Sequence, residues 1–118
     1  MYGDKMAKVN TNIDMLILSI LNKSDCYGYE IIKLIKEISQ DCLDIKEGTI
    51  YPIIYNLLKK EYISSYNIPY NNRIRVYYKI EEIGKEYLIQ CRNQYRKTSQ
   101  GIINILNYGE TNNEKGNE

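Results

Sequence analysis

Apolar side chains recur at helical spacing along much of the chain, and the clearest instance lies in residues 46–63. Its apolar positions follow the i, i+3, i+4, i+7, i+8 pattern of a helix with one buried face: Ile50, Ile53, Ile54, Leu57 and Leu58. Thr49 is the expected N-cap of this helix. That start would place Pro52 at the third helical position, where the helix does not need a backbone N–H.

Two shorter helices are predicted before this one. The first begins at a cap among residues 10–12 and ends near Leu21. The second covers residues 27–39, where Gly28 in the first turn indicates a close approach of the backbone to a neighbouring group. Residues 43–45 alternate between apolar and charged side chains, so we expect a very short strand there.

A β-hairpin is predicted directly after the helix of residues 46–63. Residues 63–68 and 73–80 have strand character, and the Pro-Tyr-Asn-Asn segment between them has the chemistry of a turn. The second strand has one apolar face, formed by Ile74, Val76, Tyr78 and Ile80. Its other face is basic and aromatic, and carries Arg73, Arg75, Tyr77 and Lys79.

The last predicted helix covers residues 82–107 and carries a heptad-like apolar seam. Beginning at Gly84, the seam continues through Leu88, Cys91, Tyr95, Thr98, Ile102 and Ile105. A small domain cannot cover so long a seam, so we expect these residues, from Leu88 on, to form a homodimer interface. Packing within one chain is the alternative. The polar residues 108–118 are expected to form a disordered tail.

Composition predicts one folded domain with a localised basic segment. The chain has 118 residues, of which 43% are hydrophobic and 26% charged. The net charge is only +1, but residues 46–79 alone carry +4, so the rest of the chain sums to −3. This distribution favours a localised anionic partner. Thirteen tyrosines supply all the aromatic side chains.

Several classes of function are excluded by what the chain lacks. Without histidine, the familiar Ser-His-Asp and Cys-His catalysts and most zinc sites are absent, so we expect neither an enzyme nor a cofactor or metal site. There is no membrane-spanning stretch and no signal peptide, which predicts a cytoplasmic protein. The three cysteines, Cys26, Cys42 and Cys91, are expected to be reduced, buried and inert, with a redox sensor as the alternative.

The exposed side of the 46–63 helix suits the major groove of DNA, since its side chains hydrogen-bond, stack or carry positive charge. An ordinary surface helix is the alternative, and for Tyr51 so is packing against another helix. Asn56 is the candidate for reading adenine, and a basic hairpin after such a helix is typical of a DNA-binding wing. The candidate DNA-binding residues are Thr49, Tyr51, Tyr55, Asn56, Lys59, Lys60, Arg73, Arg75 and Tyr29.

The element order and five sequence words resemble the PadR-like transcriptional regulators. The words are YGYEI at 27–31, EGTIYP at 47–52, Leu57, YY at 77–78 and EIG at 82–84. The resemblance covers residues 15 to 108. It implies a mainly α fold with a small β-hairpin wing, in which a winged helix-turn-helix at residues 10–80 precedes a long C-terminal dimerisation helix at residues 82–107.

The resemblance also implies a function, namely a homodimeric repressor of transcription on a pseudo-palindromic operator with half-sites about one helical turn apart. Members of the shorter subfamily include multidrug-responsive repressors, so a small apolar or aromatic effector is implied. Its pocket would be lined by Tyr95, Cys91 and Ile17. The chain departs from the family pattern at Glu61, where the family usually has glycine, and at Val76, where it usually has a basic residue.

Two other functions are compatible with the sequence. A plasmid or phage partition protein, or a DNA-binding adaptor, would use the same fold on tandem iterons rather than on one palindrome. A protein-interaction module would have lost DNA binding, because the residues around Tyr55 and Asn56 are less basic than in most of the family. A gel shift with the DNA upstream of the gene separates the second alternative from both DNA-binding functions.

Overall fold

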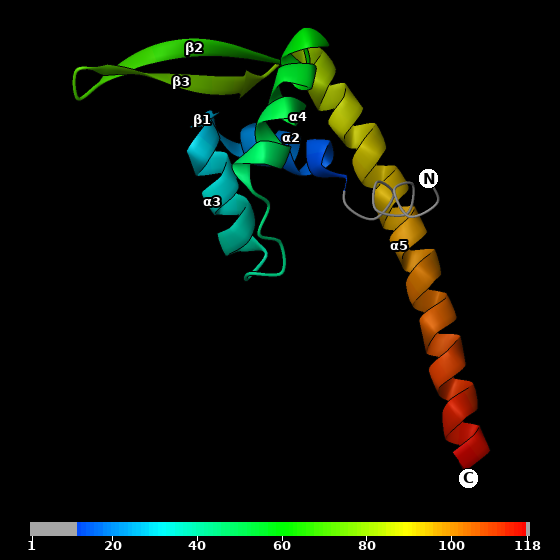
Figure 1. Cartoon of the computed structure of the whole chain (residues 1–118). Coiled ribbons are helices and arrows are strands. Elements are labelled where there is room, and N and C mark those ends of the chain that lie inside the picture. Colours follow the sequence, from blue (N-terminus) through cyan, green and yellow to red (C-terminus); the bar gives the residue numbers. More distant parts are fainter. Residues whose placement is uncertain (1–11, 118) are drawn as a thin grey trace. The chain divides into compact units, whose positions relative to one another are not determined.

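The structure is a computed structural model that describes the backbone of residues 12–117 and the side chains of residues 12–110. The described chain consists of helices and one small sheet, whose strands lie between helices in the sequence (Figure 1). Their bounds are α2 (Ile13–Lys23), β1 (Cys26–Tyr27), α3 (Gly28–Ile38), α4 (Glu47–Lys59), β2 (Ile63–Tyr70), β3 (Arg73–Ile80) and α5 (Glu82–Asn117). The predicted fold class, a mainly helical winged helix-turn-helix with a long C-terminal helix, is confirmed. Expectations for residues 1–11 lie outside the described residues.

Helices α2, α3 and α4 form where the apolar periodicity predicted them. Their inward side chains make the core together with residues from the sheet and α5, and the largest fully buried ones are Ile17, Leu18, Leu21, Ile31, Ile50, Ile54, Leu57, Ile63 and Leu88. Not every predicted inward position is covered, since Ile38 at the end of α3 is 67% exposed. The burial of these aliphatic side chains is the main force holding the three helices together.

The predicted start of α4 was wrong. Lys46 rather than Thr49 is the N-cap, and its carbonyl accepts the backbone N–H of Ile50 at 3.1 Å. Pro52 therefore lies inside the helix, at a position whose N–H would otherwise bond the carbonyl of Gly48. Gly48 is exposed, so water can satisfy that carbonyl, and the lost bond does not end the helix.

Both α3 and α4 end with a residue in the left-handed conformation. At the end of α4, Glu61 has φ 63°, and the N–H groups of Glu61 and Tyr62 donate to the carbonyls of Leu58 and Leu57 at 3.0 and 3.1 Å. This is the Schellman arrangement, in which glycine is the usual residue. Glu61 adopts it without glycine and therefore carries a conformational cost.

The short strand predicted at residues 43–45 was wrong, because those residues have no regular structure. A different two-residue strand, β1, lies just before α3. It pairs antiparallel with β3, so that Cys26 is opposite Tyr78 and Tyr27 is opposite Tyr77. Three alternating residues were too weak a signal, since a strand needs a partner that local sequence does not specify.

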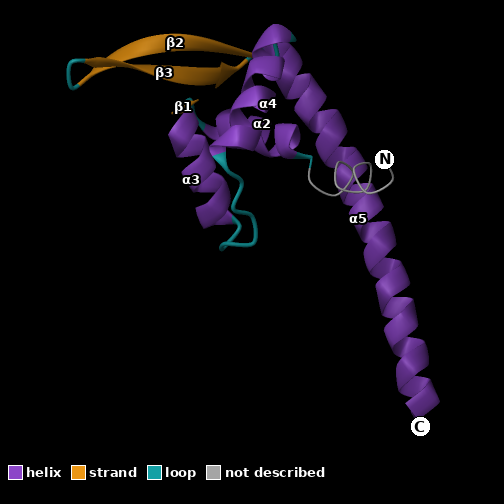
Figure 2. Ribbon diagram, in the orientation of Figure 1, coloured by secondary structure: helices purple, strands orange, loops and turns teal. Residues whose placement is uncertain are grey.

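The predicted β-hairpin is confirmed, with a tighter turn than expected. Strands β2 and β3 pair over their whole length in a three-stranded sheet of order β1-β3-β2, and the hairpin reaches away from the helices (Figures 1 and 2). The turn consists of Asn71 and Asn72, both with positive φ, as a two-residue type I′ turn requires. Pro69 belongs to β2, an edge strand that tolerates a residue without an N–H.

The chain divides into two compact units, one ending at Leu88 and the other beginning at Ile89. The first turns of α5 belong to the first unit, because Gly84 and Leu88 are buried there. The sequence had placed the boundary earlier, between residues 80 and 82. Helix α5 also continues beyond residue 107 to Asn117, where a disordered tail was expected. No proline interrupts this polar segment, and its backbone stays helical.

Candidate nucleic-acid interface

The outer side of α4 presents most of the side chains that the sequence proposed for DNA. Thr49, Tyr55, Asn56, Lys59 and Lys60 are all exposed. Their exposure follows from the helical repeat, because Ile50, Ile54 and Leu57 on the other side of α4 are buried. The front of α4 is therefore a polar, aromatic and cationic surface held by an aliphatic back.

Tyr51 is the member of this set that packs inside the protein as well. Its ring lies against the backbone of Gly28, where an added Cβ would overlap the hydroxyl and come within 2.7 Å of the ring. The close approach predicted for Gly28 is thereby confirmed. Burial, and then the charge of Glu47, raise the pKa of Tyr51, so its hydroxyl stays protonated near neutral pH.

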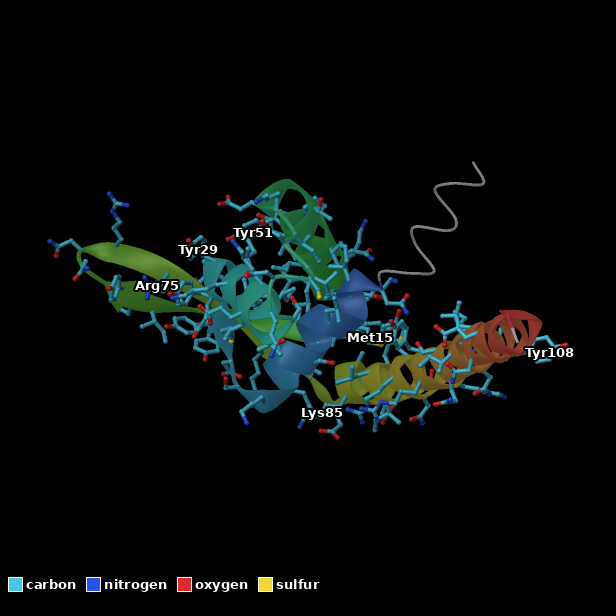
Figure 3. All side chains as sticks on the ribbon, turned by 90° about the horizontal axis from the view of Figure 1, so that it is seen from below. Met15, Tyr29, Tyr51, Arg75, Lys85 and Tyr108 are labelled. Atoms are coloured by element: carbon cyan, nitrogen blue, oxygen red, sulfur yellow. The ribbon has the colours of Figure 1, made fainter. Side chains whose placement is uncertain are left out.

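Tyr29 follows Gly28 on α3 and is 59% exposed. Tyr29 and Tyr51 lie on the same side of the first unit, and Lys85 lies on the opposite side (Figure 3). The contact between Tyr51 and Gly28 brings the start of α3 next to the front of α4. Tyr29 and the front of α4 thus form one continuous surface from two helices.

The two wing arginines have different surroundings, which the sequence did not foresee. Arg73 is exposed beside the turn, at the start of β3. The Arg75 guanidinium instead lies between two rings, 4.0 Å from the centroid of Tyr27 and 3.8 Å from that of Tyr70. Arg73 is therefore free to approach a phosphate, whereas both faces of Arg75 are covered.

Arg75 belongs to a cluster of tyrosines on the outer face of the sheet that sequence reasoning missed. Tyr77 packs against Tyr27 and Tyr66, with ring centroids 5.6 and 5.8 Å apart. The Tyr66 hydroxyl donates to Asp25 at 2.6 Å, and this bond raises the pKa of Tyr66 to about 12. The strand register was the available signal, since alternate residues of β2 and β3 share one face.

The front of α4 and the tip of the wing carry predominantly positive charge. In the described part of the chain, the ion pairs join Lys36 and Lys46 to Asp44, at 3.9 and 3.0 Å. Lys59 and Arg73 lie outside these pairs, so they can interact with an external anion. The acidic Glu47 lies in the first turn of α4, where the helix dipole favours it.

The proposed dimer residues all lie on α5, but they differ in exposure. Tyr95, Thr98, Ile102 and Ile105 are exposed, and Ile105 reaches 70%. Leu88 is only 1% exposed, because it packs in the core of its own chain, and is thus unavailable to a second copy in this conformation. Gly84, also placed in the seam, is buried against the carbonyl of Tyr62.

The proposed effector residues are distributed over both units. Ile17 is completely buried in the first unit, so it cannot line an open pocket there. Cys91 and Tyr95 belong to α5 in the second unit. The first unit has an apolar groove of about 580 Å³ between α2 and α3, lined by Leu16, Ser19, Ile20, Leu34, Ile38 and Leu43, among others.

The cysteines differ from expectation, because only one of the three is buried. Cys26 is in the core, Cys91 is half-buried and Cys42 is exposed. Burial, and then the charge of Glu30, raise the pKa of Cys26 to about 11. Among residues 12–117, no helix is apolar enough over sufficient length to cross a bilayer. No cluster of metal-ligating side chains occurs among residues 12–110.

The chain is similar in sequence and fold to known transcriptional regulators. The model of the transcriptional regulator PadR-like family matches residues 17–90. An uncharacterised protein of Lysinibacillus sphaericus is 31% identical over 86% of this chain and 93% of its own length. A transcriptional regulator from Clostridium thermocellum has 35% identity and a TM-score of 0.73, over 80% of this chain and 92% of that one.

A more distant similarity is to the Bacillus subtilis PadR solved in complex with operator DNA. It has 25% identity and a TM-score of 0.61, and the match covers 66% of this chain and 45% of that one. The family match spans most of the first unit, including the words from which the resemblance was drawn. The chain therefore belongs to the PadR-like family, whose members regulate transcription and are not enzymes.

Proposed function

We propose that this protein is a cytoplasmic transcriptional repressor that binds a pseudo-palindromic operator as a homodimer. The observation that carries the proposal is the surface formed by the front of α4 and the tip of the wing. There, Lys59, Lys60 and Arg73 are exposed and lie outside the ion pairs of the described residues. The similarity to a PadR bound to operator DNA supports a duplex as the anion.

In this proposal α4 enters the major groove and the wing contacts the flanking backbone. Thr49, Tyr51 and Tyr55 contact phosphates or base edges, and Asn56 reads adenine through its amide. Lys59, Lys60 and Arg73 neutralise phosphates. Tyr29 places the start of α3 against the DNA backbone.

Dimerisation through α5 would bring two such surfaces onto one operator. The exposed apolar side chains of the second unit support it, because Ile102 and Ile105 have no cover within the described residues. The proposed interface comprises Cys91, Tyr95, Thr98, Ile102 and Ile105. The two-fold axis of the dimer then requires a pseudo-palindromic site, with half-sites about one helical turn apart.

We further propose release by a small apolar or aromatic effector at the dimer interface. Tyr95 supplies an aromatic face and Cys91 a small apolar neighbour. Ile17 is omitted from the site because it is fully buried. Isothermal titration of the dimer with a panel of planar phenols and cationic drugs tests this part, and Tyr95→Ala should abolish any binding that is found.

Footprinting on the DNA that flanks the gene, repeated over a range of ionic strength, tests the proposed function. One protected palindrome beside the promoter is the expected pattern. Tandem repeats would favour the partition function, and the absence of a footprint would contradict DNA binding altogether. In the same assay Arg73→Ala should reduce the slope of log affinity against log salt by about 2 per dimer.

Lys85→Ala is the matched control for Arg73→Ala. It removes one positive charge per chain from the side of the first unit that lies away from Tyr29 and Tyr51 (Figure 3). We expect the salt slope of this variant to match that of the unmodified protein. Equal slopes for Arg73→Ala and Lys85→Ala would exclude the wing tip from the proposed interface.

A further inference from the structure

The outer half of the wing extends beyond the strand that anchors its base. Strand β1 pairs only with Tyr77 and Tyr78 of β3. From Val76 to the turn, β3 has β2 as its one partner in the described sheet. A two-stranded ribbon of this kind is flexible when nothing else holds it, so its direction depends on side-chain contacts.

Arg75 supplies such a contact across all three strands. It lies on the central strand, and its guanidinium stacks on Tyr27 from β1 and on Tyr70 from β2. Tyr70 pairs with Arg73 at the turn, so the stack reaches the end of the ribbon. We call Tyr27, Arg75 and Tyr70 the wing clamp.

The inner end of the clamp is fixed to the helix-turn-helix. Tyr27 is the N-cap of α3, and its backbone N–H donates to the carboxylate of Glu30 at 3.4 Å. The next residue, Gly28, is in contact with the Tyr51 ring of α4. A short chain of contacts therefore links the outer wing to the helix that carries the candidate base-reading side chains.

The Arg75 guanidinium is well suited to holding the wing and poorly placed to contact a phosphate. Its flat faces stack on two rings at once, which a lysine ammonium cannot do. With those faces covered and the side chain half-buried, Arg75 is held among tyrosines on the sheet, whereas Arg73 is exposed at the tip.

We propose that Arg75 is a positioning residue, which aims the outer wing at the DNA by holding it to the start of α3. This inference rests on the proposed DNA binding for its consequence, although the clamp itself does not. It reassigns Arg75 from phosphate neutralisation, the role expected from sequence. The charge of Arg75 is then secondary, and its planar shape is what matters.

The test is Arg75→Lys, which keeps the charge and loses the flat stacking surface. Backbone ¹⁵N relaxation of the DNA-free protein should show order parameters for residues 67–76 falling from about 0.85 toward 0.6. Duplex affinity should fall roughly five- to thirtyfold, because the lysine ammonium cannot stack on both rings at once, with the salt slope unchanged. Footprints should lose protection at the flanks but keep it where α4 binds.

Arg73→Lys is the matched control, since it makes the same exchange at the exposed arginine of the same strand. We expect it to leave the order parameters of the outer wing unchanged. Tyr70→Leu removes one ring of the clamp without altering charge, and it should reproduce the effects of Arg75→Lys.

Three results would overturn the inference. One is an outer wing in Arg75→Lys as rigid as in Arg73→Lys. Another is a mobile wing with unchanged affinity and footprint. The third is a reduced salt slope in Arg75→Ala together with full affinity in Arg75→Lys, which would make Arg75 a phosphate contact. If the unmodified protein binds no duplex, the proposed function fails, and the relaxation data still decide whether the clamp holds the wing.

Discussion

Replacing Gly84 with alanine should destabilise the protein, although alanine is normally the better helix former by about 1 kcal/mol. Gly84 lies in the first turn of α5, and its backbone is in close contact with Tyr62. A Cβ at this position would overlap the carbonyl oxygen of Tyr62. It would also lie 2.9 Å from the carbonyl carbon and 3.1 Å from Cγ1 of Ile80.

The magnitude follows from what must move to relieve this overlap. The Tyr62 carbonyl cannot swing away freely, because it accepts the backbone N–H of Glu81 at 2.9 Å. If α5 shifts instead, that hydrogen bond weakens, at about 0.5–1.5 kcal/mol, and Leu88 loses part of a burial worth about 1.5–3 kcal/mol. After allowance for the helix propensity of alanine, we expect a net loss of about 1–3 kcal/mol.

Urea unfolding followed by circular dichroism measures this change. With a denaturant slope of about 1.5–2 kcal/mol/M, the midpoint should fall by about 0.5–2 M while the slope stays constant. All variants are compared at one protein concentration, because the proposed dimerisation would couple stability to concentration. Gly48→Ala is the control, since an added Cβ there meets nothing within 4 Å. A Gly84→Ala midpoint at or above the unmodified value would refute this explanation.

Three further outcomes are expected. Glu61→Gly should raise the thermal midpoint through a gain of about 0.5–1 kcal/mol, because glycine adopts the positive φ at the end of α4 without strain; a lower midpoint would contradict this. A thiol reagent at neutral pH should modify exposed Cys42 at once and buried Cys26 only after unfolding. Mass spectrometry of digests measures the two modification rates, and equal rates would show that burial does not protect Cys26. Ile102→Glu should yield monomers in sedimentation velocity while Asn104→Glu, on the opposite side of α5, stays dimeric; a micromolar dimer in the first variant would remove α5 from the interface.

Predictions from sequence succeeded where structure depends on a local repeat. The inward faces of α2 and α4 are visible as apolar positions three and four apart, and β3 as an alternation of two. Aliphatic side chains must leave water, so a periodic pattern specifies both the element and the side that is buried. The same patterns predict the exposed front of α4 and the hairpin wing.

The misses arise where the local pattern allowed more than one outcome. Thr49 has the chemistry of an N-cap, yet α4 begins earlier and accommodates Pro52 in its interior. Leu88 fits the heptad seam, yet the core of its own chain buries it. For Leu88 the local signal was sound, and packing in the core of its own chain decided between two ways of burying it.

By itself, then, the sequence determined the order of the helices and of the two hairpin strands, the apolar sides of α2 and α4, and the family to which the protein belongs. Tertiary structure alone decided that Tyr51 closes over Gly28, that β1 pairs with β3, and that Arg75 lies between two tyrosine rings. The physical reason is that periodic burial is written into neighbouring residues. A ring stacked on a guanidinium exists only once separate strands have been brought into register.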